Sequence, residues 1–299
     1  MALVSITKDQ LASRDAARQR GSSGYLNLLK FGALLTAIIV FGIVFSIIFK
    51  GAPAITWEFL TAPPKDGMTA GGIAPMIRGS ILLMFGTFLL VIPLGVLGGV
   101  CLAEYAGTGK LVGFMRACVT SLAGTPSVIY GLFGYAFFVL LLKLGTSLMA
   151  GWLTLMLLAM PVIVLSTEQA IKSVPDSLVE AGYALGLSRW QTMWKIILPN
   201  ALPGIATGLI LSSGRAAGEA PPIILTCGIY FEGVARTAVT WETLKQPVSN
   251  LPYHVFEGYR QGGVIPERVV WGTCFTLIVF VLLLNLTAIL LRARARSQS

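Results

Sequence analysis

Long stretches without a single charged residue dominate this sequence and limit what it can fold into. Each reaches the roughly 20 apolar residues that a helix needs to cross the hydrocarbon core of a bilayer. Five such stretches are Phe31–Phe49, Ile81–Ala103, Ala117–Leu142, Leu144–Thr167 and Val269–Leu291. A sixth stretch, residues 199–230, is apolar on both sides of Arg215 and Glu219, so we count it as a span as well.

A backbone in lipid has no water to hydrogen-bond, so it must satisfy its own N–H and C=O groups. We therefore predict an all-α polytopic membrane protein whose six transmembrane helices occupy residues 31–291. If both termini lie on one side, 13 Lys and Arg residues fall on that side and 8 on the other. Because cytoplasmic loops carry the excess of positive charge, segment 1–30 and the basic tail 292–299 are expected to be cytoplasmic.

The composition excludes several other classes of protein. Only 12% of the residues are charged, and the mean hydropathy is +0.79, whereas a soluble chain carries about 25% charged residues. The net charge of +9 does not indicate nucleic-acid binding, because no stretch interleaves basic and aromatic residues. The four cysteines are scattered, without the spacing of a disulfide framework or a metal site. No nucleophile–base arrangement indicates catalysis.

The loop 173–199, predicted to lie between the fourth and fifth spans, has the spacing of two short helices. Ser177 and Glu180 are spaced as a capping box, and so are Ser188 and Gln191. Gly186 lies between them and supplies the left-handed residue that ends a helix. The small residues Ala181, Gly182 and Ala184 would let the first helix dock closely into a partner. An ordinary interfacial connector is an equally good interpretation of this pattern.

The same loop resembles the EAA loop of ABC importer permeases. The matching residues are Glu180, Ala181, Gly182, Gly186, Ile196, Leu198 and Pro199. Gly182 departs from the family, which usually has alanine there. The resemblance implies a cytoplasmic coupling helix that fits into a cleft of a separate ATPase subunit, and the membrane fold of ABC importer permeases.

Three further segments resemble the PstA-type permeases of phosphate importers: residues 71–80, 122–134 and 215–221. This resemblance implies inorganic phosphate as substrate, in a bacterial inner membrane. It also implies a second, PstC-like permease, a PstB-like ATPase dimer that holds ATP and Mg, and an external PstS-like phosphate-binding protein. The chain has Ala220 where the family commonly has threonine.

Arg215 and Glu219 indicate a function without any family argument. Counted from Pro203 at about 1.5 Å per residue, Arg215 lies about 18 Å into a hydrocarbon core about 30 Å thick. Ionisable groups at such a depth normally face a bundle interior or a water-filled path. An arginine fork suits a phosphate oxyanion, so both residues are candidates for the substrate path. The alternative is that the i,i+4 pair only orients two helices.

The sequence contains no phosphate-binding loop for ATP. The segment from Gly107 to Lys110 resembles one, but Leu111 replaces the required Ser or Thr, and Glu104 occupies the first glycine position. ATP must therefore be handled by another chain, and no cofactor is expected here. Other interpretations stay open: a permease for sulfate or molybdate, a PstC-type partner subunit, a phosphate-sensing membrane protein, or a polytopic membrane enzyme. Glu168 with Lys172, and His254, are expected to lie on the surface.

Overall fold

We describe the protein from a computed structural model, which covers residues 8–105, 107, 109–229 and 241–296. The predicted segment 1–30, the basic tail 292–299 and the stretch 231–268 between the fifth and sixth predicted spans therefore lie partly outside the described residues, as do the side chains before Tyr25 and most of those after Leu290. The α-helices are α1 Lys8–Gly51, α2 Trp57–Thr61, α3 Ala74–Val100, α4 Lys110–Ala123, α5 Ser127–Gly134, α6 Leu148–Lys172, α7 Asp176–Ala184, α8 Arg189–Thr192, α9 Leu198–Gly218, α10 Pro221–Thr226, α11 Trp241–Leu244, α12 Leu251–Arg260 and α13 Glu267–Arg296. Short π-helical segments are Cys101–Tyr105, Tyr135–Leu141 and Met193–Ile197, and 3-10 turns are Ala52–Ala54 and Asp66–Met68. Strands β1 Pro64–Lys65 and β2 Ala70–Gly71 form a small antiparallel hairpin.

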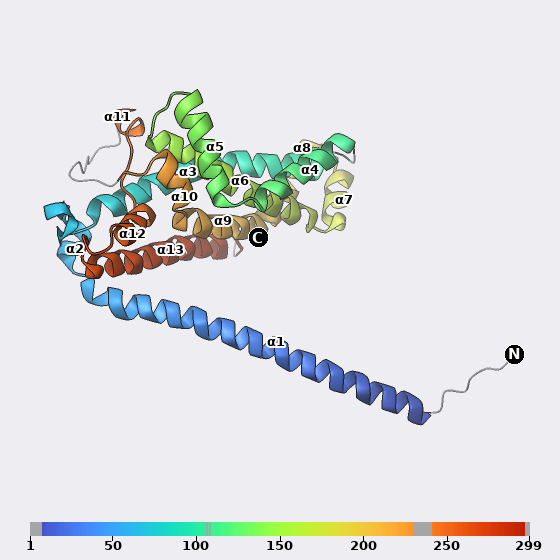
Figure 1. Cartoon of the computed structure of the whole chain (residues 1–299). Helices are drawn as coiled ribbons and strands as arrows, with labels where there is room; N and C mark the ends of the chain where they lie inside the picture. Colours follow the sequence, from blue (N-terminus) through green and yellow to red (C-terminus); the bar gives the residue numbers. More distant parts are fainter. Residues whose placement is uncertain (1–7, 106, 108, 230–240, 297–299) are drawn as a thin grey trace.

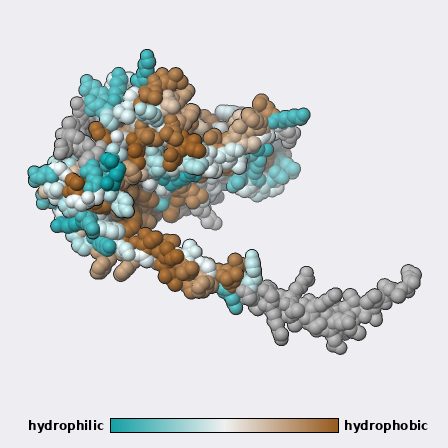
Figure 2. All heavy atoms as spheres, viewed as in Figure 1, coloured by the Kyte–Doolittle hydropathy of each residue, from teal (hydrophilic) through white to brown (hydrophobic). Residues whose placement is uncertain are grey.

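The described part of the chain is a bundle of helices long and apolar enough to cross a membrane. There are five such helices, or six if the bent pair α4–α5 counts as one span. Helices α2 and α12 lie at one end of the bundle and α7 and α8 at the other (Figure 1); we call these the α12 end and the α7 end. Hydrophobic residues cover the middle of the bundle, and hydrophilic residues gather at the two ends (Figure 2). The predicted all-α polytopic fold is confirmed.

Two predicted spans are not continuous helices. Within residues 117–142, α4 and α5 meet at a bend of 104° next to Pro126. Proline has no N–H to continue a helix and disfavours helical backbone at the residue before it. Within residues 199–230, α9 ends at Gly218 and Glu219 is extended (φ −75°, ψ 124°), because Pro221 and Pro222 follow. Both breaks leave backbone carbonyls at the helix ends without an intrahelical partner.

The centre of the bundle is formed by α3, α6 and α9, which small residues bring close together. Gly86 lies directly against the Trp152 ring, whose indole N–H donates to the Leu82 carbonyl at 3.0 Å. On α9, an added Cβ at Gly204 would come within 2.6 Å of Ala170 on α6. These contacts are typical of membrane helices, where close backbone approach replaces the hydrophobic effect as the source of packing energy.

Helix α1 lies apart from this bundle. Its most apolar window is 0% buried, and in Figure 1 it diverges from α13. Only its last turns contact the bundle, where Gly51 packs on Trp271 and Phe275 of α13. The apolar surface of α1 suits a lipid environment, or the surface of another membrane subunit.

The α12 end has its own core, and His254 belongs to it rather than to the surface. The imidazole is 3% exposed, with Nε2 3.1 Å from the Met68 sulfur and Nδ1 3.1 Å from the Thr273 hydroxyl. The expectation of a surface histidine is therefore wrong. Burial disfavours the charged imidazolium, so it lowers the pKa of His254 from 6.5 to about 4.

This burial predicts that acid weakens the α12 end. As the pH falls from about 6.5 to about 4, His254 binds a proton in the unfolded chain but stays neutral in the folded chain. The free energy of unfolding therefore decreases. Between pH 7 and pH 4.5 the loss from this group should be about 2 kcal/mol. Unfolding of the purified protein at both pH values would measure it, with His254→Gln as the comparison. An equal acid-dependent loss in the variant would contradict the assignment.

Candidate functional site

The loop between α6 and α9 folds into the two short helices that its spacing predicts, except at the first helix start. Helix α7 begins at Asp176 after Pro175, whose side chain offers no cap, so Ser177 lies inside the helix. The predicted capping box of Ser177 and Glu180 is wrong. Pro175, whose fixed φ is near −59°, sets an earlier helix start than the spacing of Ser177 and Glu180 indicates.

The second helix start is predicted correctly. The Ser188 N–H donates to Gln191 Oε1 at 2.9 Å, and the Gln191 N–H donates to Ser188 Oγ at 3.3 Å. Gly186 between the helices has a φ of +79°. The Gly186 N–H donates to the Tyr183 carbonyl at 2.9 Å, and the Leu187 N–H donates to the Gly182 carbonyl at 3.1 Å. This Schellman arrangement ends α7 at the predicted glycine.

The matched EAA residues lie together but do not all face outward. Gly182 is buried, and an added Cβ would lie 2.6 Å from Ile196 Cδ1. Gly182 therefore lets α7 pack on the chain's own next helix, which corrects the expectation that it helps to dock a partner. Glu180, Ala181 and Gly186 are exposed, whereas Ile196, Leu198 and Pro199 are half-buried where α9 begins.

Large apolar side chains on the surface of this region were not singled out from the sequence. They are Leu178, Tyr183 and Leu185 on and after α7, and Trp190 and Trp194 on the next helical stretch. Leu185 is 81% exposed. Large apolar side chains that are exposed together on a loop are typical of a protein–protein contact. The sequence signal was the i,i+4 spacing of Trp190 and Trp194.

Arg215 and Glu219 lie on either side of the break between α9 and α10. Arg215 Nε is 3.5 Å from Glu219 Oε1, with the side chains 34% and 14% exposed. Arg215 occupies the last turn of α9, where a cation also interacts favourably with the helix dipole. The predicted i,i+4 pair is present, but it is long and leaves part of the guanidinium uncovered by this chain.

The second break, between α4 and α5, lies next to the first. An added Cβ at Gly131 on α5 would lie 3.0 Å from the Pro221 carbonyl oxygen of α10. The neighbouring Tyr130 interacts electrostatically with Arg215, and its hydroxyl donates to the Leu122 carbonyl at 2.7 Å across the bend. Tyr130 is therefore a site residue that the sequence analysis included only as part of a motif.

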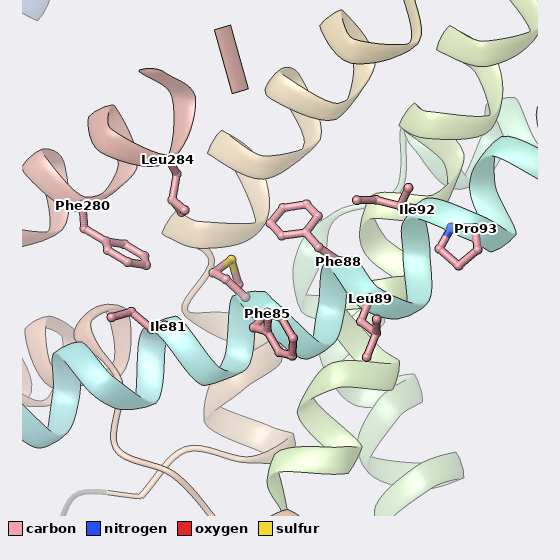
Figure 3. Close-up of a pocket in the computed structure, with 9 residues that line it drawn as sticks. Ile81, Phe85, Phe88, Leu89, Ile92, Pro93, Phe280 and Leu284 are labelled. Atoms are coloured by element: carbon pink, nitrogen blue, oxygen red, sulfur yellow. The ribbon is translucent and has the colours of Figure 1, made fainter. Parts of the chain in front are cut away.

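Two cavities in the described structure have apolar walls. One, of about 610 Å³, lies between α3 and α13 (Figure 3). The other, of about 330 Å³, lies between α4, α5 and α6 and includes Tyr130. Neither wall carries a charged residue, so a free anion has no counter-charge in either. Among the described residues no group of three or more His, Cys, Asp or Glu could hold a metal ion.

A family model matches most of this helical bundle. Residues 92–296 match the family described as "Binding-protein-dependent transport system inner membrane component". The chain belongs to this family. It is a multi-pass permease component of an ABC transporter, and not the ATPase.

Relatives and solved structures agree with this assignment of the permease. It is 37% identical over 264 residues to the probable ABC transporter permease protein YqgI of Bacillus subtilis (strain 168), covering 86% of this chain and 89% of that protein. It is 33% identical over 256 residues to the phosphate transport system permease protein PstA of Yersinia pestis, covering 85% and 84%.

Among solved structures, the permease is similar to the inward-facing MetNI methionine ABC transporter, with a TM-score of 0.56 and 20% identity over 75% of this chain and 94% of that chain. It is also similar to a bacterial alginate ABC transporter in complex with an alginate-bound periplasmic protein, with a TM-score of 0.60 and 15% identity over 92% and 93%. These similarities confirm the predicted permease fold.

Proposed function

We propose that this permease forms part of the path for inorganic phosphate in an ATP-driven importer. The observation that carries the proposal is the partly exposed Arg215 at a break in a membrane helix. A guanidinium presents two parallel N–H donors that match two oxygens of a phosphate. The relatives described as phosphate permeases support phosphate over sulfate or molybdate, and a transporter over a phosphate sensor or a membrane enzyme.

When no anion is bound, the negative charge of Glu219 balances the positive charge of Arg215. Its carboxylate holds Arg215 through a long contact of 3.5 Å, which an arriving anion displaces at little cost. The displaced carboxylate then repels the anion, because like charges inside a membrane interact strongly. The pair therefore favours passage over tight retention, as a transport path requires.

Because one side of Arg215 is exposed, another subunit must complete the wall of the anion path there. We assign this role to a PstC-like second permease. An external PstS-like phosphate-binding protein would dock at the α12 end, and a PstB-like ATPase dimer, which holds ATP and Mg, at the α7 end. The termini would be cytoplasmic, in a bacterial inner membrane. In this arrangement the exposed apolar side chains of α7, with Glu180 and Ala181, form the contact with the ATPase. Alternating access then follows from ATP-driven movement of α7.

The coupling role predicts a specific effect at Gly186. Gly186→Val places a β-branched residue at a φ of +79°, where such residues are strained, so α7 loses its angle to the next helix. The ATPase subunit should co-purify less, and hydrolysis should no longer respond to the loaded binding protein. Gly186→Asn is the matched control, because Asn tolerates left-handed backbone. Normal assembly and stimulation in the valine variant would count against the role of α7.

The anion-contacting role predicts the behaviour of three charge variants. Arg215→Gln removes the charge and the fork, so phosphate uptake by the assembled importer should fall by about 100-fold or more. Arg215→Lys keeps the charge without the planar fork and should retain partial uptake. If the pair only joins helices, the double variant Arg215→Gln with Glu219→Gln should recover stability and uptake together.

If Arg215 serves the anion, the double variant should be stable and still inactive. Uptake and thermal stability of the same preparations in proteoliposomes distinguish the two cases. Near-normal uptake by a stably assembled Arg215→Gln importer would overturn the proposal.

A further inference from the structure

A second charged cluster lies at the α7 end of the bundle, away from Arg215. Glu168 on α6 is not the surface residue that its spacing with Lys172 indicates, because its side chain is only 7% exposed. Its Oε1 lies 2.8 Å from Arg116 Nε on α4 and 2.6 Å from Lys172 Nζ on its own helix. Arg116 also donates from a terminal nitrogen to the Leu102 carbonyl at 2.9 Å. One guanidinium therefore joins the ends of three spans.

Arg116 belongs to a helix that is otherwise loosely attached. Most residues of α4 are exposed, and only Val112 is buried. Its far end is the 104° bend into α5. At Gly124 in that bend, the nearest atom to an added Cβ is the chain's own Ser121 carbonyl oxygen at 3.7 Å, so Gly124 itself is not packed against another helix. Helix α4 is thus an arm held at one end by the bend, where Tyr130 donates to the Leu122 carbonyl, and by an ion pair toward the other.

The ion pair lies beyond the α7 end of the cavity between α4, α5 and α6. Val119 of α4 and Val164 of α6 line that cavity. Arg116 lies three residues and Glu168 four residues farther toward the α7 end, on the same helix faces. The cavity also includes Tyr130 of α5. The ion pair therefore lies next to a cavity between α4 and α6.

The chemistry of the cluster allows the pair to separate. Arg116 Nε is buried and close to the carboxylate, but its N–H makes no aligned hydrogen bond, so charge attraction rather than directed bonding holds the contact. Arg116 is 36% exposed, so the rest of the chain does not enclose it. When it leaves, Lys172 on α6 still neutralises Glu168, so the buried carboxylate is not left unpaired, which is the costly outcome for a buried pair.

We propose that Arg116 and Glu168 form a latch that holds α4 against α6 and opens during the transport cycle, with Lys172 as the partner that stabilises the open state. Both latch residues are positioning residues, since neither contacts the anion in the site at Arg215. The proposal rests on the proposed path through Arg215 only for the direction of opening. The existence of two α4 positions is independent of the substrate.

The test measures the distance between α4 and α6 in the assembled importer. Spin labels on Gly113→Cys and Ser173→Cys report it, after the exposed Cys101 and Cys118 are replaced by serine. Gly113 has open space around it, so the label is tolerated. We expect one distance at rest and a second, longer one during turnover with ATP and Mg.

Removing the charge of Arg116 and removing that of Lys172 should change the distance between α4 and α6 in opposite directions. Arg116→Gln should populate the long distance severalfold more at rest, and Arg116→Lys should restore the short one. Lys172→Gln should suppress the long distance during turnover, because Glu168 then has no other partner. A purely structural cluster would loosen in both variants, and that result, or an unchanged distance in Arg116→Gln, would overturn the latch. Loss of phosphate specificity with these distances intact would instead contradict only the proposed function.

Discussion

The cost of placing polar groups in lipid determines this structure more than any other constraint. It forces the backbone into helices, and it makes every interruption of a helix a place where carbonyls and charges need partners. The two interruptions, beside Pro126 and beside Pro221, lie against one another through Gly131. The bundle therefore concentrates its freed polar groups in one region instead of spreading them over its lipid-facing surface. Arg215 and Tyr130 belong to that region.

Two charged pairs of this bundle have contacts that suit movement. Arg215 and Glu219 lie on either side of a broken helix, and Arg116 and Glu168 join an arm to the central helix α6. Neither contact is a set of aligned short hydrogen bonds: one is 3.5 Å long, and the other leaves the buried Nε–H without an aligned acceptor. Contacts of this kind hold a resting state and separate readily when a stronger partner arrives. A rigid structural bridge would instead use the bidentate geometry that arginine can offer.

The sequence predicts features that depend on neighbours along the chain and fails where neighbours across the bundle decide. Gly186 and the Ser188–Gln191 cap are local, and both are found as expected. The burial of His254, of Glu168 and of Gly182 depends on Met68, Arg116 and Ile196, which spacing alone does not bring near. Pro126 itself indicates a bend, but the apolar residues on both sides of it favour the prediction of one continuous span. Arg215 stands out in the sequence because a charge in an apolar stretch needs no tertiary information to be unusual.

The central claim is that the break between α9 and α10 lines the anion path, and thiol protection tests it most directly. A cysteine at Gly218, which is exposed with open space around it, should react with a water-soluble maleimide in the assembled importer. Phosphate should slow that reaction, and sulfate should slow it much less. Leu211→Cys, on an exposed part of the same helix, is the control and should show no protection by phosphate. A Gly218→Cys importer that is unreactive, or equally reactive with and without phosphate, would contradict the account.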